Sequence, residues 1–161
     1  MVGPRVLPGC FPPLFERLFD LSPVSPGDSQ DALRLRGKDV RESVARAVAR
    51  LLDTRRHVPL AVAAAEGRLT VLDYGIPEFG LASPDDLSAR WLMSKAIRRA
   101  IEAFEPRLRT PTVELMPVAD RRGVLDVRIT GYLADGETVE PVTFRRALAA
   151  DFSDMAHDSG S

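Results

Sequence analysis

Residues 83–109 read SPDDLSARWLMSKAIRRAIEAFEPRLR, and this stretch decides the fold that we predict for the chain. Ser83 suits the N-cap of a helix, and the two aspartates that follow favour the positive end of the helix dipole. Pro106 disfavours helical geometry at the residue before it, so the helix should end at the corner Glu105-Pro106-Arg107. The pattern predicts one long amphipathic helix whose apolar stripe contains Leu87, Trp91, Met93, Ile97, Ala100, Ile101 and Phe104.

A second amphipathic helix is predicted from Asp39 to about Arg55. Asp39 and Glu42 resemble a capping box at its start, and Pro59 prevents its continuation. Further towards the N-terminus, the pattern PPLFERLFD within residues 11–20 predicts a short apolar helix on a polar linker. The core stripe of the second long helix should contain Val40, Val44, Ala47, Val48 and Leu51.

After the corner, the hydrophobic period changes from helical to alternating. Residues 112–118, 125–133 and 138–145 are therefore predicted to be strands, joined by the turns ADRRG and ADGE. Each turn places a glycine where a left-handed residue is needed. Pro141 has no N–H group to donate, which marks the last strand as an edge of the sheet.

Together these elements predict an α+β fold in which two long helices and a short N-terminal helix pack on a three-stranded antiparallel sheet. The predicted domain covers residues 39–150, with an N-terminal segment at 1–38 and a flexible tail at 151–161. Residues 58–82 form a long connection between the helices, and connections of such length are usually functional or packed by their own side chains. Here Tyr74, Ile76 and Phe79 could supply that packing.

The composition restricts the possible classes of protein. The chain has 161 residues, a formal net charge of -1 and a pI near 6.1, so it lacks the basic excess of a sequence-independent nucleic-acid binder. Cys10 is the only cysteine, which excludes an intramolecular disulfide and favours a reducing cytoplasm. No apolar run reaches the roughly 18 residues needed to cross a membrane, and no secretory signal is evident at the N-terminus.

Catalytic motifs are scarce. The sequence has no phosphate-binding glycine loop, no G-x-S-x-G turn and no HExxH pair, and His57 and His157 are its only histidines. Asp73, Glu78 and Glu105 remain candidates for a glycosidase-type carboxylate pair, although solvated loop acids are the more common case.

The last predicted strand offers a different kind of site. An exposed strand edge can bind another chain by strand addition, but Pro141 and the flanking arginines could equally protect it. The paired arginines at 121–122 and 145–146 favour a solvated face or a protein partner over RNA, because no aromatic residues are interleaved with them.

Three motifs occur in order along the chain: Leu51-Leu52-Asp53-Thr54-Arg55, then Tyr74-Gly75-Ile76-Pro77-Glu78-Phe79, then Glu105-Pro106-Arg107. Over residues 11–148 the chain thereby resembles the phage T4 baseplate-wedge lysozyme-like family, and within it the TssE subunits of bacterial type VI secretion systems. Family members commonly have asparagine at the position of Asp53 and Leu-Pro-Asp in place of Ile76-Pro77-Glu78. The Glu-Pro-Arg motif matches without change.

The resemblance implies a structural subunit with no enzymatic activity, no cofactor and no metal. Such a subunit would link the wedge subunits TssF and TssG, with TssK as an optional further partner, to the sheath subunits TssB and TssC, and would help to start sheath polymerisation. It would be cytoplasmic, assembled at the cytoplasmic face of the inner membrane without inserting into it, and would bind no nucleic acid. A peptidoglycan-cleaving, lysozyme-like hydrolase is the alternative.

The residues expected to carry this function fall into two groups. The residues expected to bind partners are Glu105, Pro106, Arg107, Val139, Val142, Phe144 and Arg145. The residues expected to support the loops are Asp53, Thr54, Arg55, Asp73, Tyr74 and Gly75. The sequence leaves open whether Glu105 and Arg107 contact a partner directly or brace the fold that does.

Overall fold

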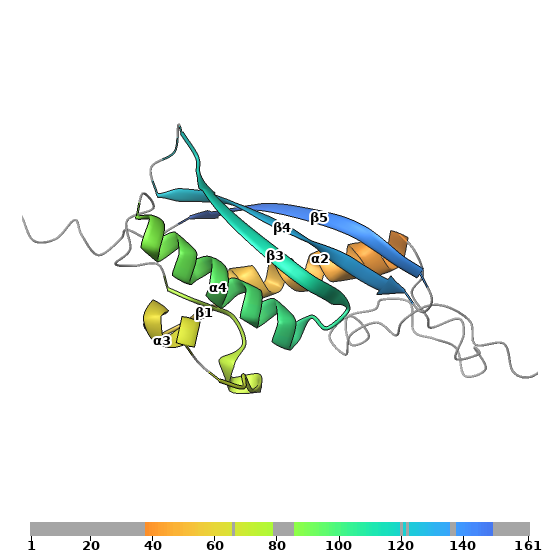
Figure 1. The fold of residues 1–161 in the computed structure, drawn as a ribbon, viewed down its shortest axis with the longest axis horizontal. Helices are drawn as coiled ribbons and strands as arrows, with labels where there is room; N and C mark the ends of the chain where they lie inside the picture. The colour runs from red at the N-terminus through yellow and green to blue at the C-terminus, as the bar shows by residue number, and fades with distance from the viewer. Residues whose placement is uncertain are drawn as a thin grey trace, which may run out of the picture.

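The computed structural model describes residues 38–65, 67–78, 86–119, 121, 123–135 and 138–149. Figure 1 shows two long helices lying on one face of a twisted three-stranded sheet, which confirms the predicted α+β class. The predicted short helix at 11–20 and the tail at 151–161 lie outside the described residues. In chain order the elements are α2 (Lys38–Asp53), β1 (Arg55–Arg56), α3 (Leu60–Ala65), η1 (Val71–Asp73), β2 (Ile76–Pro77), α4 (Leu87–Phe104), β3 (Leu108–Pro117), β4 (Val124–Asp135) and β5 (Thr138–Ala149).

Helix α4 begins later than the sequence predicts. Asp86 is its N-cap, and the Asp86 carboxylate accepts hydrogen bonds from the backbone N–H groups of Ser88 at 2.8 Å and Ala89 at 3.3 Å. The prediction of Ser83 as the cap is therefore wrong, and residues 83–85 lie outside the described part of the chain. The strong preference of aspartate for this position, with its oxygen in reach of two free N–H groups, explains the difference.

The core stripe of α4 also differs from the predicted one. Met93, Ile97 and Ile101 are fully buried, whereas Leu87 and Trp91 are 73% and 62% exposed. Because an α-helix has about 3.6 residues per turn, Trp91 lies almost opposite Met93 and cannot share its face. The N-terminal half of α4 therefore presents apolar side chains to solvent.

Helix α2 packs beside α4 through a stripe that confirms most of the prediction. Its buried residues are Val40, Ser43, Val44, Val48, Leu51 and Leu52. The helix already includes Lys38, so Asp39 lies inside the first turn, and the predicted capping box is wrong. Glu42 instead makes an exposed ion pair with Lys38, which is one helical turn away, at 3.5 Å.

The sheet has the order β3-β4-β5, with both pairs antiparallel, as predicted. The alternation predicted for the middle strand is confirmed, because Leu125, Val127, Ile129 and Leu133 are all buried against the helices. Gly123 adopts φ 77° at the first turn, as expected for a left-handed turn residue. The second predicted turn glycine, Gly136, lies outside the described residues.

The connection between α2 and α4 contains regular structure that the sequence did not predict. It holds the short helix α3, the one-turn 3-10 helix η1, and a parallel pairing of β1 with β2. Ile76 is fully buried in the core, as its predicted packing role requires, while Phe79 lies outside the described residues. The connection therefore packs as part of the domain.

Candidate functional site

The corner at the end of α4 is formed by backbone hydrogen bonds around Pro106. Glu105 is the C-cap of the helix, and its N–H donates to the Ile101 carbonyl at 2.8 Å. The Glu105 carbonyl then accepts from the N–H of Leu108 at 3.0 Å, where β3 begins. Pro106 has no N–H to donate, so the helical ladder cannot continue past this point.

Glu105 and Arg107 form an internal ion pair at this corner. The Arg107 guanidinium donates from Nε to Oε1 and from Nη2 to Oε2 of Glu105, both at 2.7 Å. Only 5% of the Glu105 side chain and 14% of the Arg107 side chain are exposed. The fold therefore buries both charged groups and pairs them with each other.

Ser43 connects the corner to the other long helix. It is fully buried on α2, and its Oγ accepts a hydrogen bond from Nη1 of Arg107 at 2.9 Å. A planar guanidinium can make a bidentate pair and still donate elsewhere, which suits Arg107 to this junction. The corner therefore holds the end of α4 against α2, and Pro106 is its exposed residue. The partner contacts assigned to Glu105, Pro106 and Arg107 stay predictions.

A second motif closes the gap between the end of α2 and β2. Both the N–H and the hydroxyl of Thr54 donate to the Arg50 carbonyl, at 3.1 and 2.8 Å, while the Thr54 carbonyl accepts from the N–H of Ile76 at 2.9 Å. The Arg55 guanidinium donates to the Leu52 carbonyl at 2.6 Å, satisfying a carbonyl of the last helical turn. Thr54 and Arg55 thus bond the last turn of α2, and Thr54 joins it to β2.

We expect Gly75→Ala to destabilise the protein by about 1 to 3 kcal/mol, the usual cost of a strained backbone conformation. Gly75 adopts φ 115°, and a Cβ atom there would lie 2.7 Å from the Thr54 carbonyl oxygen. The free energy of unfolding from urea titration measures the effect. Gly67→Ala is the matched control, because a Cβ atom at Gly67 would meet nothing within 4 Å. Equal effects of the two substitutions would contradict the close contact at Gly75.

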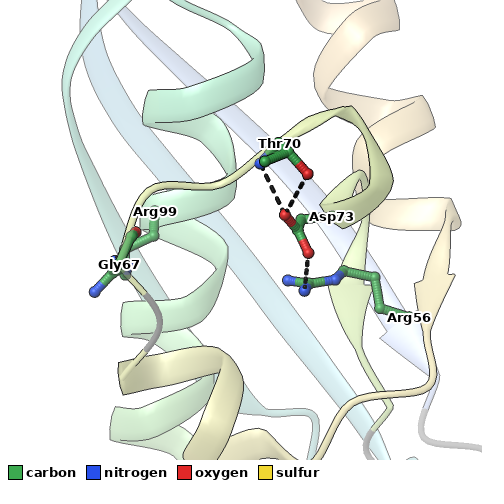
Figure 2. Close-up of polar contacts among 5 residues, drawn as sticks. All are labelled: Arg56, Gly67, Thr70, Asp73 and Arg99. Atoms are coloured by element: carbon green, nitrogen blue, oxygen red, sulfur yellow. Dashed lines mark hydrogen bonds and ion pairs between the residues drawn. The ribbon is translucent and has the colours of Figure 1, made fainter.

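Asp73 holds the turn η1 to the rest of the domain. Figure 2 shows its carboxylate between two partners: Oδ2 accepts from both the N–H and the hydroxyl of Thr70 at 2.8 Å, and Oδ1 accepts from Nη2 of Arg56 at 2.9 Å. Only 7% of the Arg56 side chain is exposed. Nearby, Nη2 of Arg99 on α4 donates to the Gly67 carbonyl at 2.6 Å. These contacts fix both ends of the 67–73 segment.

The hydrogen bonds at Asp73 should be sensitive to acid. The backbone N–H and hydroxyl of Thr70, together with the charge of Arg56, hold the pKa of Asp73 below its usual 3.8. A lowered folded-state pKa means that the stabilisation is fully present above pH 3.8 and is lost as the pH falls through the folded pKa. We therefore expect Asp73→Asn to lower the free energy of unfolding at pH 7. The difference from wild type should become smaller as the pH falls.

Chemical denaturation of wild type and Asp73→Asn between pH 7 and pH 2 measures the difference in their free energies of unfolding. The NMR shift of the Thr70 amide reports the titration of Asp73 locally. A stability difference between wild type and Asp73→Asn that stays constant down to pH 2 would contradict the assignment.

Tyr74 joins the connecting loop to the corner. Its ring packs edge-on against Phe104 with centroids 5.2 Å apart and an interplanar angle of 64°. Burial raises the pKa of the Tyr74 phenol, the Glu105 carboxylate raises it further, and the hydrogen-bonded guanidinium of Arg50 opposes the rise. The Tyr74-Gly75 motif and the Glu105-Pro106-Arg107 motif therefore lie together, although thirty residues separate them in the sequence.

Strand β5 carries the other predicted partner residues. Val139 and the Arg145 side chain are each 60% exposed, Phe144 is half-buried, and Val142 is only 3% exposed and belongs to the core. The Val142 side chain therefore faces the helices and is not available to a partner. Arg145 pairs with Asp126 of β4 at 2.6 Å, which raises the pKa of its guanidinium.

Asp53 makes a long-range contact with the sheet, and its expected part in supporting the loop stays a prediction. Both of its carboxylate oxygens accept from Nη2 of Arg146 on β5, at 2.7 and 2.6 Å, so it connects the end of α2 to the edge of the sheet. Ninety-three positions separate the two residues. The Asp53–Arg146 pair has no local sequence signal. The only sign of the Ser43 contact is a small polar residue within an otherwise apolar stripe.

The two edges of the sheet are not equivalent. The register of β3 shifts between Arg109 and Thr112, where Thr110 has φ 47° and is followed by Pro111. The hydroxyl of Ser94 on α4 also donates to the Val113 carbonyl of β3 at 2.6 Å. By contrast, β5 pairs with β4 without a register shift from end to end, and no described strand lies on its outer side. β5 is therefore the better edge for strand addition.

Each of the three acids considered for a hydrolase has a basic side chain beside it. Asp73 pairs with Arg56, Glu105 with Arg107, and Glu78 with His57 at 3.3 Å on the surface. A general acid needs a raised pKa, whereas that of Asp73 is lowered. Within the described part of the chain, no three His, Cys, Asp or Glu side chains gather as a metal site. No helix among the described residues is long and apolar enough to cross a membrane.

The candidate site therefore consists of a braced helix-to-strand corner, a loop packed against it and one open sheet edge. Residues 38–137 match the family model described as baseplate wedge protein gp25, and the chain belongs to this family. The match covers all three sequence motifs and the first two strands of the sheet. The predicted resemblance to the baseplate-wedge family is confirmed, and the chain is a structural protein of the baseplate-wedge type. No curated protein matches the chain.

Proposed function

We propose that this protein is the TssE-type subunit of a bacterial type VI secretion apparatus, which links the wedge complex to the contractile sheath and helps to start sheath polymerisation. It acts in the cytoplasm, at the cytoplasmic face of the inner membrane, and has no catalytic role. Membership of the baseplate-wedge family supports a structural role and interaction with other baseplate components.

The observation that carries the sheath contact is the difference between the two edges of the sheet. A strand added to β5 would extend a ladder that has no register shift, although it would miss the N–H that Pro141 lacks, whereas β3 has a register shift and contains Pro111. Main-chain hydrogen bonds supply the affinity in this type of recognition, and exposed side chains such as Val139 and Arg145 would supply selectivity. The sheath subunits TssB and TssC are the proposed donors of the added strand.

The wedge contact is proposed at the other surface, around Pro106. The Glu105–Arg107 pair and the edge-on contact of Tyr74 with Phe104 fix the shape of this surface before a partner arrives. Preorganisation of this kind reduces the entropy lost on binding. TssF and TssG are the proposed partners here, with TssK as a further candidate.

A pull-down of the tagged chain from its native cells tests the proposal. Wedge and sheath proteins should both be recovered with it. Recovery of neither would contradict the proposed function, as would release of muropeptides from purified cell wall by the wild-type chain but not by Glu105→Gln, which would favour the hydrolase alternative.

A further inference from the structure

The turn η1 exposes two adjacent aliphatic side chains. Val71 is 85% and Leu72 is 91% exposed, the highest values among the large apolar residues that the structure describes. Scattered apolar residues are normal on a surface, but two neighbours raised on the same turn form a compact apolar projection. We call Val71 and Leu72 the apolar knob.

The knob is held rigidly, although its side chains contribute little to the core. Thr70 and Asp73 bond to each other across the turn, the N–H of Asp73 donates to the Thr70 carbonyl at 2.9 Å, and the buried Arg56 anchors Asp73 to β1. Figure 2 shows the contacts of the Asp73 side chain with Thr70 and Arg56, and Arg99 beside Gly67, whose carbonyl accepts a hydrogen bond from Arg99 of α4. Fixing the backbone in this way reduces the ordering cost of inserting the two side chains into a partner.

The knob is continuous with the corner. Tyr74 directly follows η1 and packs against Phe104, the last residue of α4, and Glu105 and Pro106 come next. Figure 1 shows the yellow-green turn of η1 beside the C-terminal end of α4. The knob and the corner are therefore linked through the contact between Tyr74 and Phe104.

We infer that the apolar knob anchors the wedge interface by inserting into an apolar socket on the wedge protein that docks at the corner. This inference rests on the proposed function and adds to it the chemistry of the contact. The polar groups of Thr70 and the N–H and carboxylate of Asp73 are already bonded within the chain, and the exposed side chains between them are aliphatic, so the socket should supply mainly aliphatic or aromatic surface. Buried anchors of this kind dominate the affinity of many interfaces.

Binding of the full-length chain to the purified TssF–TssG wedge complex tests the inference. We expect Leu72→Asp to weaken this binding by about tenfold or more, and Val71→Ala combined with Leu72→Ala to weaken it less strongly. Both side chains are exposed, so the unfolding midpoint should stay unchanged. Val62→Asp is the matched control, because Val62 is 50% exposed on the separate element α3, and it should bind like wild type.

The possible outcomes separate the knob from the proposed function. If the wild type binds the wedge complex and Leu72→Asp binds it equally well, the inference about the knob is wrong, while the proposed function still stands. No wild-type binding to the wedge complex would contradict both. If Leu72→Asp alters self-association or binding to lipid vesicles but leaves wedge binding unchanged, the occupant is a second copy or a membrane and the inference is wrong.

Discussion

Replacing Arg107 with alanine should lower the free energy of unfolding by about 3 to 5 kcal/mol, the usual effect of removing one partner of a buried ion pair. Glu105 is 3% exposed and accepts two hydrogen bonds from Arg107, so the substitution would remove both of these charge-assisted bonds from a buried carboxylate. Ser43 on α2 would lose the hydrogen bond that it accepts from the same guanidinium. Urea unfolding of wild type and variant measures the loss directly.

Two further variants separate the stability of the corner from its binding. Arg107→Lys should recover only part of the stability, because one ammonium group cannot reproduce a bidentate guanidinium contact. The double substitution Glu105→Leu with Arg107→Met removes both charges and should be much closer to wild type. If this folded double variant still binds the wedge complex, Glu105 and Arg107 brace the fold; if it does not, they contact the partner. A change below about 1 kcal/mol for Arg107→Ala would be typical of an exposed pair and would contradict the buried one.

The second large effect is expected at the sheet edge, where Thr143→Pro should abolish sheath binding and leave wedge binding intact. Pro141 pairs with Tyr132 inside an unbroken ladder, and a proline is tolerated in a strand only where its N–H side faces away from the neighbouring strand. Backbone directions alternate along a strand, so the N–H of Thr143 should also point outward. A proline there removes a donor from the free edge while preserving the pairing with β4.

Thr143→Ala is the matched control, because it shortens an exposed side chain but keeps the N–H group. Val142→Pro is a less specific test, since Val142 is buried and its loss would disturb the core as well. Binding of TssB–TssC to each purified variant, followed by pelleting of assembled sheath, gives the readout. Sheath binding by Thr143→Pro at the wild-type level would exclude strand addition at β5.

The long elements of this fold could be predicted because each has a clear hydrophobic period. Alternation along β4 and the spacing of Val44, Val48 and Leu51 on α2 agree with the structure almost residue by residue. The residue type of Trp91 does not predict its exposure, because tryptophan is apolar. Its angular position on the helix does, since that position lies away from the core face. The short elements α3, β1 and β2 depend on tertiary contacts and have too few residues for a periodic signal.

The corner was located correctly from Pro106, but its chemistry was not predictable. Whether a Glu and an Arg around a proline face solvent or each other depends on what packs above them, and here that is α2, with Ser43 lying 64 positions earlier. The same holds for Arg146, whose partner Asp53 is on α2. The motifs could be read from the sequence, whereas the contacts of their residues depend on burial and on pairing with residues far away in the chain.

The most direct measurement is a three-component capture experiment. The TssF–TssG wedge complex is immobilised, TssB–TssC sheath subunits are added, and the amount of retained sheath protein is compared with and without this chain. Our account predicts that sheath subunits are retained only when the chain is present, and that Thr143→Pro stays bound to the wedge but retains no sheath. Equal retention without the chain, or no retention with it, would contradict its role as the link between wedge and sheath.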